Sequence, residues 1–175
     1  MHIFNKNIFK YNDLYNKIIS LTRKKFFYTE ISLKDDLITR LYLVLFHLGF
    51  ILELLKKDTK NKKLAQNIYD LFFKNIEFNL REIGLGDISV NKKMKDLIKL
   101  FYEILIYCEH WNLKEPNVKI QFLKTLFDKN NERNFDKEKL LNYLDNFRHN
   151  LKDISLNFLI KGIITNKKLL IYGCT

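Results

Sequence analysis

Apolar residues recur every three or four positions over most of this chain, a spacing typical of amphipathic helices. The run over residues 41–52, LYLVLFHLGFIL, is apolar nearly all round. A helix without a wide polar face belongs at the centre of a bundle. We therefore expect an all-α fold built around this segment. The pattern predicts helices over residues 12–23, 37–55, from 64, 90–108, 117–127 and 136–158.

Residues of capping type indicate where several of these helices begin. Ser32, with Asp35 three residues later, resembles a capping box and predicts the start of the central helix. Asn117, directly after Pro116, is expected to cap the short helix that follows. Asp136 is expected to begin the last long helix, which keeps a heptad-like spacing as far as Phe158.

The end of the chain gives a weaker pattern. Gly162 is suited to end the last helix, because glycine accepts the left-handed backbone found there. The tail over residues 163–175 fits a strand or an extended arm, and the two alternatives remain open.

Two glycines, Gly84 and Gly86, lie close together and discourage continuous helix. We expect a structured loop over residues 80–89, in which these glycines supply positive φ and Asp87 or Ser89 caps the next helix. Arg81 and Asp87 flank the turn and are able to pair across it. Bracing the loop and contacting a partner are both open roles for this pair.

Composition indicates one globular domain over residues 1–175. The chain is 47% hydrophobic and 14% aromatic, and only 5 glycines and 1 proline punctuate it, which favours helices over an all-β fold. The 2 cysteines, Cys108 and Cys174, form no disulfide framework and indicate a reducing compartment. Neither belongs to a closely spaced cysteine pair, so zinc is disfavoured.

The net charge of +11 allows more than one interpretation. A basic surface attracts RNA, ribosomes or anionic lipid. The alternative is the codon usage of an AT-rich genome, because lysine, asparagine and isoleucine are all abundant while arginine, the preferred group for phosphate recognition, is scarce. We favour the compositional alternative and expect no sequence-specific DNA binding.

The first residues show neither a secretory signal nor an arginine-bearing transit segment. The apolar run over residues 41–52 is shorter than the ~20 residues that span a bilayer. We therefore interpret it as a buried helix.

Eleven residues between positions 80 and 102 follow a recognisable order and spacing. They are Leu80, Arg81, Glu82, Gly84, Gly86, Asp87, Lys92, Lys93, Met94, Phe101 and Tyr102. This pattern resembles the ubiquinol–cytochrome c chaperone family, with weaker similarity back to residue 19, so that it covers about residues 19–107. One difference is that Glu103 and Ile104 stand where the family usually has glycine and arginine.

The resemblance implies transient, non-catalytic binding of newly made cytochrome b, or of complex III assembly intermediates, while haem is acquired. It places the protein at the cytoplasmic face of the inner membrane, or on the matrix side in a mitochondrion, with a ribosome or a small protein as further partners. It implies no cofactor. The candidate contact residues that it suggests are Arg81, Glu82, Asp87, Lys92, Lys93 and Tyr102. The rival hypothesis is a basic helical module that binds the ribosome, RNA or an anionic membrane.

Three adjacent aromatic residues, Phe26, Phe27 and Tyr28, occupy a segment expected to be short and irregular. One interpretation is a surface for a hydrophobic client or a membrane interface, and the other is that the rings fold over the end of the bundle. The lysines of the fourth helix (Lys92, Lys93, Lys95 and Lys99) likewise fit a solvated face or a site for anionic partners.

No catalytic or metal-binding motif is apparent. The four histidines lack partners at metal-ligand spacing, and neither cysteine has an adjacent base. His47 lies within the apolar run, where a hydrogen-bonded core histidine is favoured over a haem or metal contact. The pair Gly84 and Gly86 lacks the residues of a phosphate-binding loop. We therefore predict a protein that is not an enzyme and holds no metal.

Overall fold

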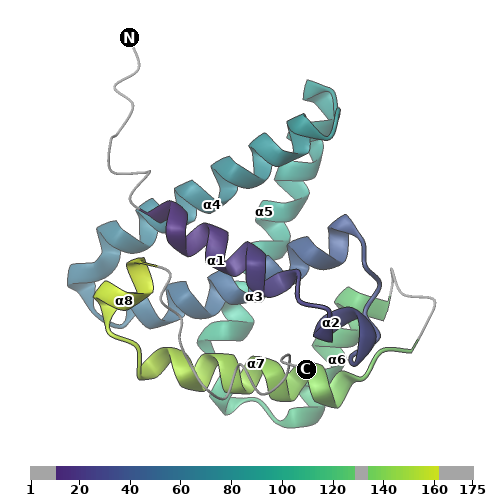
Figure 1. The fold of residues 1–175 in the computed structure, drawn as a ribbon. Coiled ribbons are helices and arrows are strands. Elements are labelled where there is room, and N and C mark those ends of the chain that lie inside the picture. The colour runs from purple at the N-terminus through teal and green to yellow at the C-terminus, as the bar shows by residue number, and fades with distance from the viewer. Residues whose placement is uncertain (1–10, 129–133, 162–175) are drawn as a thin grey trace.

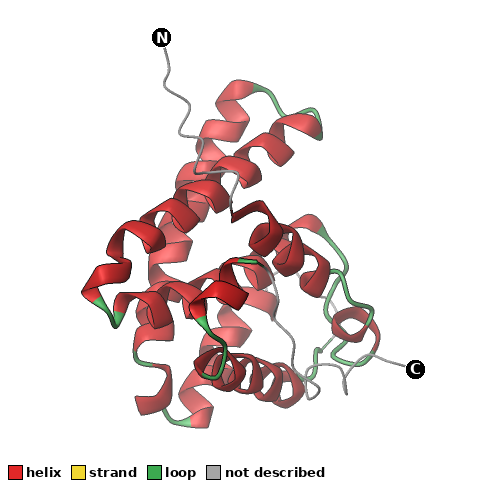
Figure 2. Ribbon diagram, turned by 60° about the vertical axis from the view of Figure 1, so that its left-hand side comes forward, coloured by secondary structure: helices red, strands yellow, loops and turns green. Residues whose placement is uncertain are grey.

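The computed structural model describes residues 11–128 and 134–161, and every regular element within these residues is a helix (Figure 2). This confirms the predicted all-α bundle. The α-helices are α1 (Asn12–Thr22), α2 (Phe26–Thr29), α3 (Leu37–Lys56), α4 (Lys62–Glu82), α5 (Asp87–Glu109), α6 (Pro116–Phe127), α7 (Lys137–Lys152) and α8 (Leu156–Ile160), with short 3-10 turns η2 (Thr59–Asn61) and η3 (Trp111–Leu113). The tail over residues 163–175 and Gly162 lie outside the described residues.

Helix α3 is the centre of the bundle, as its apolar pattern predicts. It packs against α1, α4, α5 and α7, and Figure 1 shows it behind α1 and in front of α5. Phe46 and Phe50 are fully buried and contact Trp111 edge-on, with ring centroids 6.2 and 5.2 Å apart. By length and composition α3 is long and apolar enough to cross a membrane. The core helix of a soluble protein can be equally long and apolar, and most of α3 is buried inside this bundle.

His47 lies in this core and is fully buried. Its Nδ1 is 2.6 Å from the carbonyl oxygen of Leu43, and its Nε2 is 2.7 Å from the hydroxyl of Tyr143. Because a carbonyl only accepts, Nδ1 carries the proton and Nε2 accepts from the tyrosine. Burial lowers the pKa of His47 from 6.5 to about 4, so the ring is neutral at pH 7. The predicted structural histidine, hydrogen-bonded to a neighbouring carbonyl, is confirmed.

Two helices begin at residues other than those predicted. Asp36 is the N-cap of α3 and accepts a hydrogen bond of 2.8 Å from the Thr39 amide. Ser32 has φ of 62°, a left-handed conformation incompatible with the extended backbone of an N-cap. Glu115 is the N-cap of α6, whose first residue is Pro116, so Asn117 lies inside the helix. Proline suits this first position because its missing amide would have no partner there.

The predicted last helix is two helices. Asp136 caps α7 as expected, but α7 ends at Lys152. Ser155 then accepts a hydrogen bond from the Phe158 amide and starts α8. This local bond offers the backbone a new helix start, so the direction of the chain changes. Phe158 consequently leaves the heptad stripe and is 53% exposed.

Helices α4 and α5 form a hairpin whose end projects from the rest of the bundle (Figure 1). The loop is shorter than the predicted 80–89, because α4 continues through Glu82 and α5 begins at Asp87. Gly84 has φ of 87°, which confirms the need for glycine there. Gly86 has φ of −67° and is the N-cap of α5, so the prediction of positive φ at Gly86 is wrong. The predicted caps of α5 are also wrong, since both Asp87 and Ser89 lie inside the helix.

Candidate functional site

The turn of the α4–α5 hairpin is braced by the predicted ion pair. The guanidinium of Arg81 donates to the carboxylate of Asp87 across the turn and to that of Glu77, one helical turn earlier, at 2.8 Å. Hydrogen bonding to the two carboxylates raises the pKa of Arg81. All three side chains are accessible to solvent, so the pairs orient the turn more than they stabilise the fold.

Exposed apolar side chains surround this turn. Phe78 and Ile83 are each 58% exposed, and Ile88 is 87% exposed. Single exposed apolar residues are common on protein surfaces, but three large ones beside one projecting turn form a cluster that is typical of an interaction surface. The end of the hairpin therefore presents both charge and apolar surface to the outside.

An open hollow of ≈ 540 Å³ lies beside the hairpin and is called here the α3–α5 groove. Helices α3, α4, α5 and α6 all contribute residues to its lining. Its apolar lining includes Leu37, Ile38, Leu41, Leu97, Leu100 and Leu126, and its charged lining is Lys93, Asp96, Lys99 and Glu103. The groove thus combines an apolar surface with charges of both signs.

A second hollow of ≈ 460 Å³ lies on the other side of the same α3 residues. Leu37, Leu41 and Leu80 line both hollows, so these leucines form the ridge between them. Glu82 lines the second hollow. Together the two hollows offer an extended, partly apolar surface along the start of α3.

The structure does not bring all the predicted contact residues together. Lys93 lines the α3–α5 groove, whereas Tyr102 lines a third hollow of ≈ 530 Å³ between α3, α4 and α5. The two residues are nine positions apart on α5, which places them on opposite faces of the helix. In the third hollow, burial and the neighbouring Tyr102 raise the pKa of Tyr69 to about 12. Lys92 is exposed and, among the described hollows, lines none. A contact role for these residues stays a prediction.

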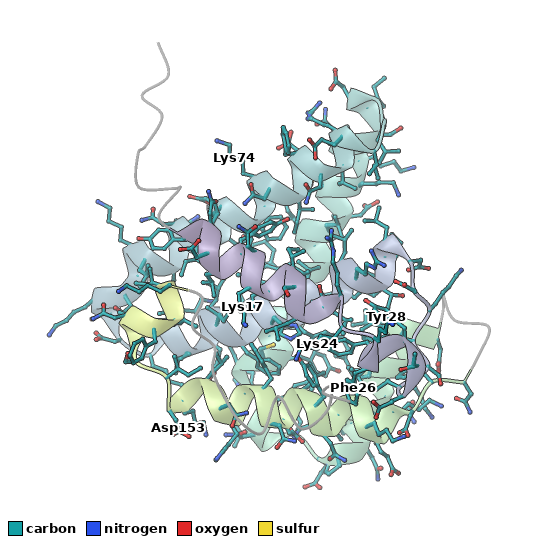
Figure 3. All side chains as sticks on the ribbon, viewed as in Figure 1. Lys17, Lys24, Phe26, Tyr28, Lys74 and Asp153 are labelled. Carbon is teal, nitrogen blue, oxygen red and sulfur yellow. The ribbon has the colours of Figure 1, made fainter. Side chains whose placement is uncertain are left out.

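The aromatic segment requires a correction. It forms the short helix α2 rather than an irregular stretch, and Phe26 and Phe27 are 5% and 0% exposed. Phe27 contacts the ring of Tyr143 edge-on at 4.8 Å, and Figure 3 shows Phe26 and Tyr28 on α2. Tyr28 is half-buried and donates to the Thr22 carbonyl. The rings therefore close the end of the bundle, because one helical turn directs the two phenylalanines inward.

Among the described residues, no three histidine, cysteine or acidic side chains lie close enough together to hold a metal ion. The thiol of Cys108 is buried against α3, and burial raises its pKa well above the usual value, which keeps it protonated and unreactive.

Apart from Lys93, the residues that line the α3–α5 groove were not predicted as a site from the sequence. Leu37, Leu41 and Leu97 fit the apolar stripes of their helices and were assigned to the core, which is confirmed for the buried Leu41 and Leu97, whereas Leu37 is 40% exposed. Nothing in the local pattern separates a leucine under another helix from one beside an open groove. The exposure of Ile88 and Ile106 could have been predicted from the sequence, because both residues lie on the face of α5 opposite its buried stripe.

Comparisons with known proteins agree with this fold. A family model described as ubiquinol–cytochrome c chaperone matches residues 29–165, beyond the region of resemblance that ends near residue 107. The crystal structure of the Cbp3 homolog from Brucella abortus superposes with a TM-score of 0.76 at 27% identity, covering 93% of this chain and 91% of that chain. Among curated proteins, no significant match was found. Because the family model covers most of the chain, this protein belongs to the ubiquinol–cytochrome c chaperone family.

Proposed function

We propose that this protein is a non-catalytic assembly chaperone for respiratory complex III, and that it binds newly made cytochrome b in the α3–α5 groove. Membership of the family supports the role in complex III assembly. The structural observation that carries the proposal is the open groove of ≈ 540 Å³ with its leucine lining. A groove of this kind accepts the apolar face of a helix or of an extended segment.

The chemistry of the client fits this surface. A membrane protein such as cytochrome b contains segments of about 20 apolar residues, which are costly to expose to water before insertion. Leucine side chains shield such a segment without a directional bond, so release needs no chemical step. Lys93 and Glu103, which also line the groove, can hold the charged residues that flank a membrane segment.

Leu37 allows a direct test of the groove. It is 40% exposed, lines both hollows and is the first residue of α3. A Leu37→Glu variant should fold normally, because a carboxylate is favourable in the first turn of a helix. Leu113→Glu is the matched control, since Leu113 is 83% exposed and lies in η3.

We expect Leu37→Glu to lose most of the cytochrome b that the wild-type chain captures during cell-free synthesis, while Leu113→Glu retains it. Far-UV circular dichroism and thermal melting establish that both variants are folded. Equal capture by the two variants would exclude the groove as the binding surface. Capture of unrelated membrane proteins to the same extent would argue against cytochrome b as the specific client.

The Arg81–Asp87 pair has two open roles, and exchanging its residues separates them. The double variant Arg81→Asp/Asp87→Arg keeps the pair across the turn with its polarity reversed, and it removes the pair between residue 81 and Glu77. If the pair only orients the turn, the exchange should recover most of the folding and of the complex III assembly that either single replacement loses, less the small contribution of the exposed pair with Glu77. If the side chains contact the client or a partner, the exchanged protein should fold and still fail in assembly.

In the cell, we place the protein at the cytoplasmic face of the inner membrane, or on the matrix side in a mitochondrion. Deletion of the gene should lower assembled complex III and haem b absorbance while cytochrome b transcription continues. Normal complex III in the deletion strain, with cytochrome b encoded in the genome, contradicts an essential assembly role.

A further inference from the structure

Helix α5 carries an exposed strip of six residues on the side away from the core. They are Ile88, Lys92, Lys95, Lys99, Tyr102 and Ile106, at alternating spacings of four and three positions. This spacing keeps them on one face over roughly 27 Å of helix. Ile88 is 87% exposed, Tyr102 is 54% and Ile106 is 57%, so the strip is apolar at both ends and cationic in its middle.

The positive charge of the strip is not compensated within the described residues. Lys92, Lys95 and Lys99 form no ion pair there. Of the four acids of α5, Asp87 pairs with Arg81 and Glu109 pairs with Lys56 at 2.8 Å, while Asp96 and Glu103 line the groove without an ion pair among the described residues.

We propose that this strip, called here the α5 strip, binds the surface of an anionic lipid bilayer. Lysine side chains reach anionic headgroups while their methylene stems stay on apolar surface. Tyrosine is suited to the membrane interface, and an exposed isoleucine at each end can enter the boundary with the acyl chains. The proposal gives a surface to the membrane location proposed above, and it does not depend on which client the groove binds.

The order of groups along the strip favours a bilayer over other anionic partners. A protein interface usually has an apolar centre and a charged rim, whereas this strip has its charges at the centre. RNA would use the lysines but gains nothing from the isoleucines, and the strip has no arginine for phosphate. A bilayer is flat and presents headgroups and acyl chains along its whole surface, so all six residues can meet it at once.

Vesicle binding by the full-length chain tests this proposal. The double variant Lys92→Gln/Lys95→Gln leaves Lys99 in place, because Lys99 also lines the groove. The matched control is Lys63→Gln/Lys152→Gln, which removes the same charge from exposed positions on α4 and α7. Co-sedimentation is measured on phosphatidylcholine vesicles with and without about 30% phosphatidylglycerol.

The wild-type chain should bind the anionic vesicles and not the neutral ones. Each lysine near an anionic surface contributes about fivefold to binding, so the strip variant should bind about 25-fold more weakly. The control variant should bind like the wild type. Replacement of Ile88 and Ile106 by serine should also weaken binding, without a change in its dependence on salt.

Three results would overturn the proposal. One is a wild-type chain that does not bind anionic vesicles, and another is an equal loss in the strip and control variants, which would assign binding to net charge. The third is a strip variant that loses binding to polyuridylate RNA while its vesicle binding is unchanged. The groove and the α5 strip are tested by separate variants, because Leu37→Glu leaves the strip intact. A wild-type chain that captures cytochrome b but does not bind anionic vesicles would therefore refute the proposal for the strip and leave the proposal for the groove standing.

Discussion

The packing of α3 against α5 at Gly49 leaves no room for a side chain, and this gives a sharp test of the fold. A Cβ atom added at Gly49 would lie 2.8 Å from the Sγ atom of Cys108 on α5. Ordinary van der Waals contact begins at about 3.4 Å, so one atom has to move by several tenths of an ångström. Cys108 is fully buried, which leaves its sulfur little room to rotate.

The variant Gly49→Ala therefore combines two opposing effects. Overpacking in a tight core costs about 1–3 kcal/mol of unfolding free energy. Replacing glycine by alanine within a helix gains about 1 kcal/mol. We expect a net loss of about 0–2 kcal/mol, although alanine is the better helix former.

Cys108→Ala supplies the matched partner for a double-mutant cycle. Alone it removes one buried sulfur and should cost about 1 kcal/mol, because it leaves a small void. With both changes present, the new methyl group takes the place of the sulfur. Its nearest neighbours are then the Ile104 Cγ2 atom at 3.5 Å and the residue 108 Cβ atom at 3.6 Å, both ordinary contacts. The double variant should equal or exceed the wild type in stability.

Urea unfolding followed by far-UV circular dichroism measures the four free energies of the cycle. We expect a favourable coupling of about 1–3 kcal/mol between the two substitutions. In thermal melts this corresponds to about 2–4 °C for each kcal/mol. The reasoning is refuted if Gly49→Ala is more stable than the wild type in the Cys108 background and the two substitutions are additive.

Three further predictions concern other positions. Gly84→Val should destabilise the fold by about 1–3 kcal/mol, because a β-branched residue is strained at φ of 87°. Gly86→Val should cost less than about 1 kcal/mol, and equal melting temperatures for the two variants would contradict this difference. Because the pKa of His47 is lowered to about 4, the unfolded state binds more protons than the folded state between pH 6.5 and about 4. The free energy of unfolding should therefore fall by about 3 kcal/mol as the pH is lowered through this range. In His47→Gln, the free energy from urea unfolding should depend less on pH over the same range. Arg148 pairs with Glu53 at 3.2 Å and both are buried, and Glu53 also pairs with Lys57 at 3.1 Å. Because Lys57 still compensates part of the Glu53 charge, Arg148→Met alone should cost about 1–3 kcal/mol, and adding Glu53→Gln should recover part of it in chemical denaturation.

Helical periodicity was sufficient to predict the fold class and the central position of α3, because a stripe of apolar residues must be buried wherever the chain can bury it. The pairing of Arg81 with Asp87 was also predictable, since the two residues flank a turn and are close in sequence. Gly84 followed from the same local reasoning, whereas Gly86 did not, because each glycine adopts only the conformation that its own position in the turn requires.

Local sequence determined the helices, the turn and the chemical character of each face, because these depend on neighbours a few residues away. The tertiary structure decided which apolar residues remain open to solvent. Phe26 and Phe27 are core residues because α7 covers them, whereas Leu37 is 40% exposed beside the groove because no element of the described chain closes over it. Burial depends on residues distant in sequence, so a helix pattern alone cannot distinguish a core leucine from one that awaits a partner.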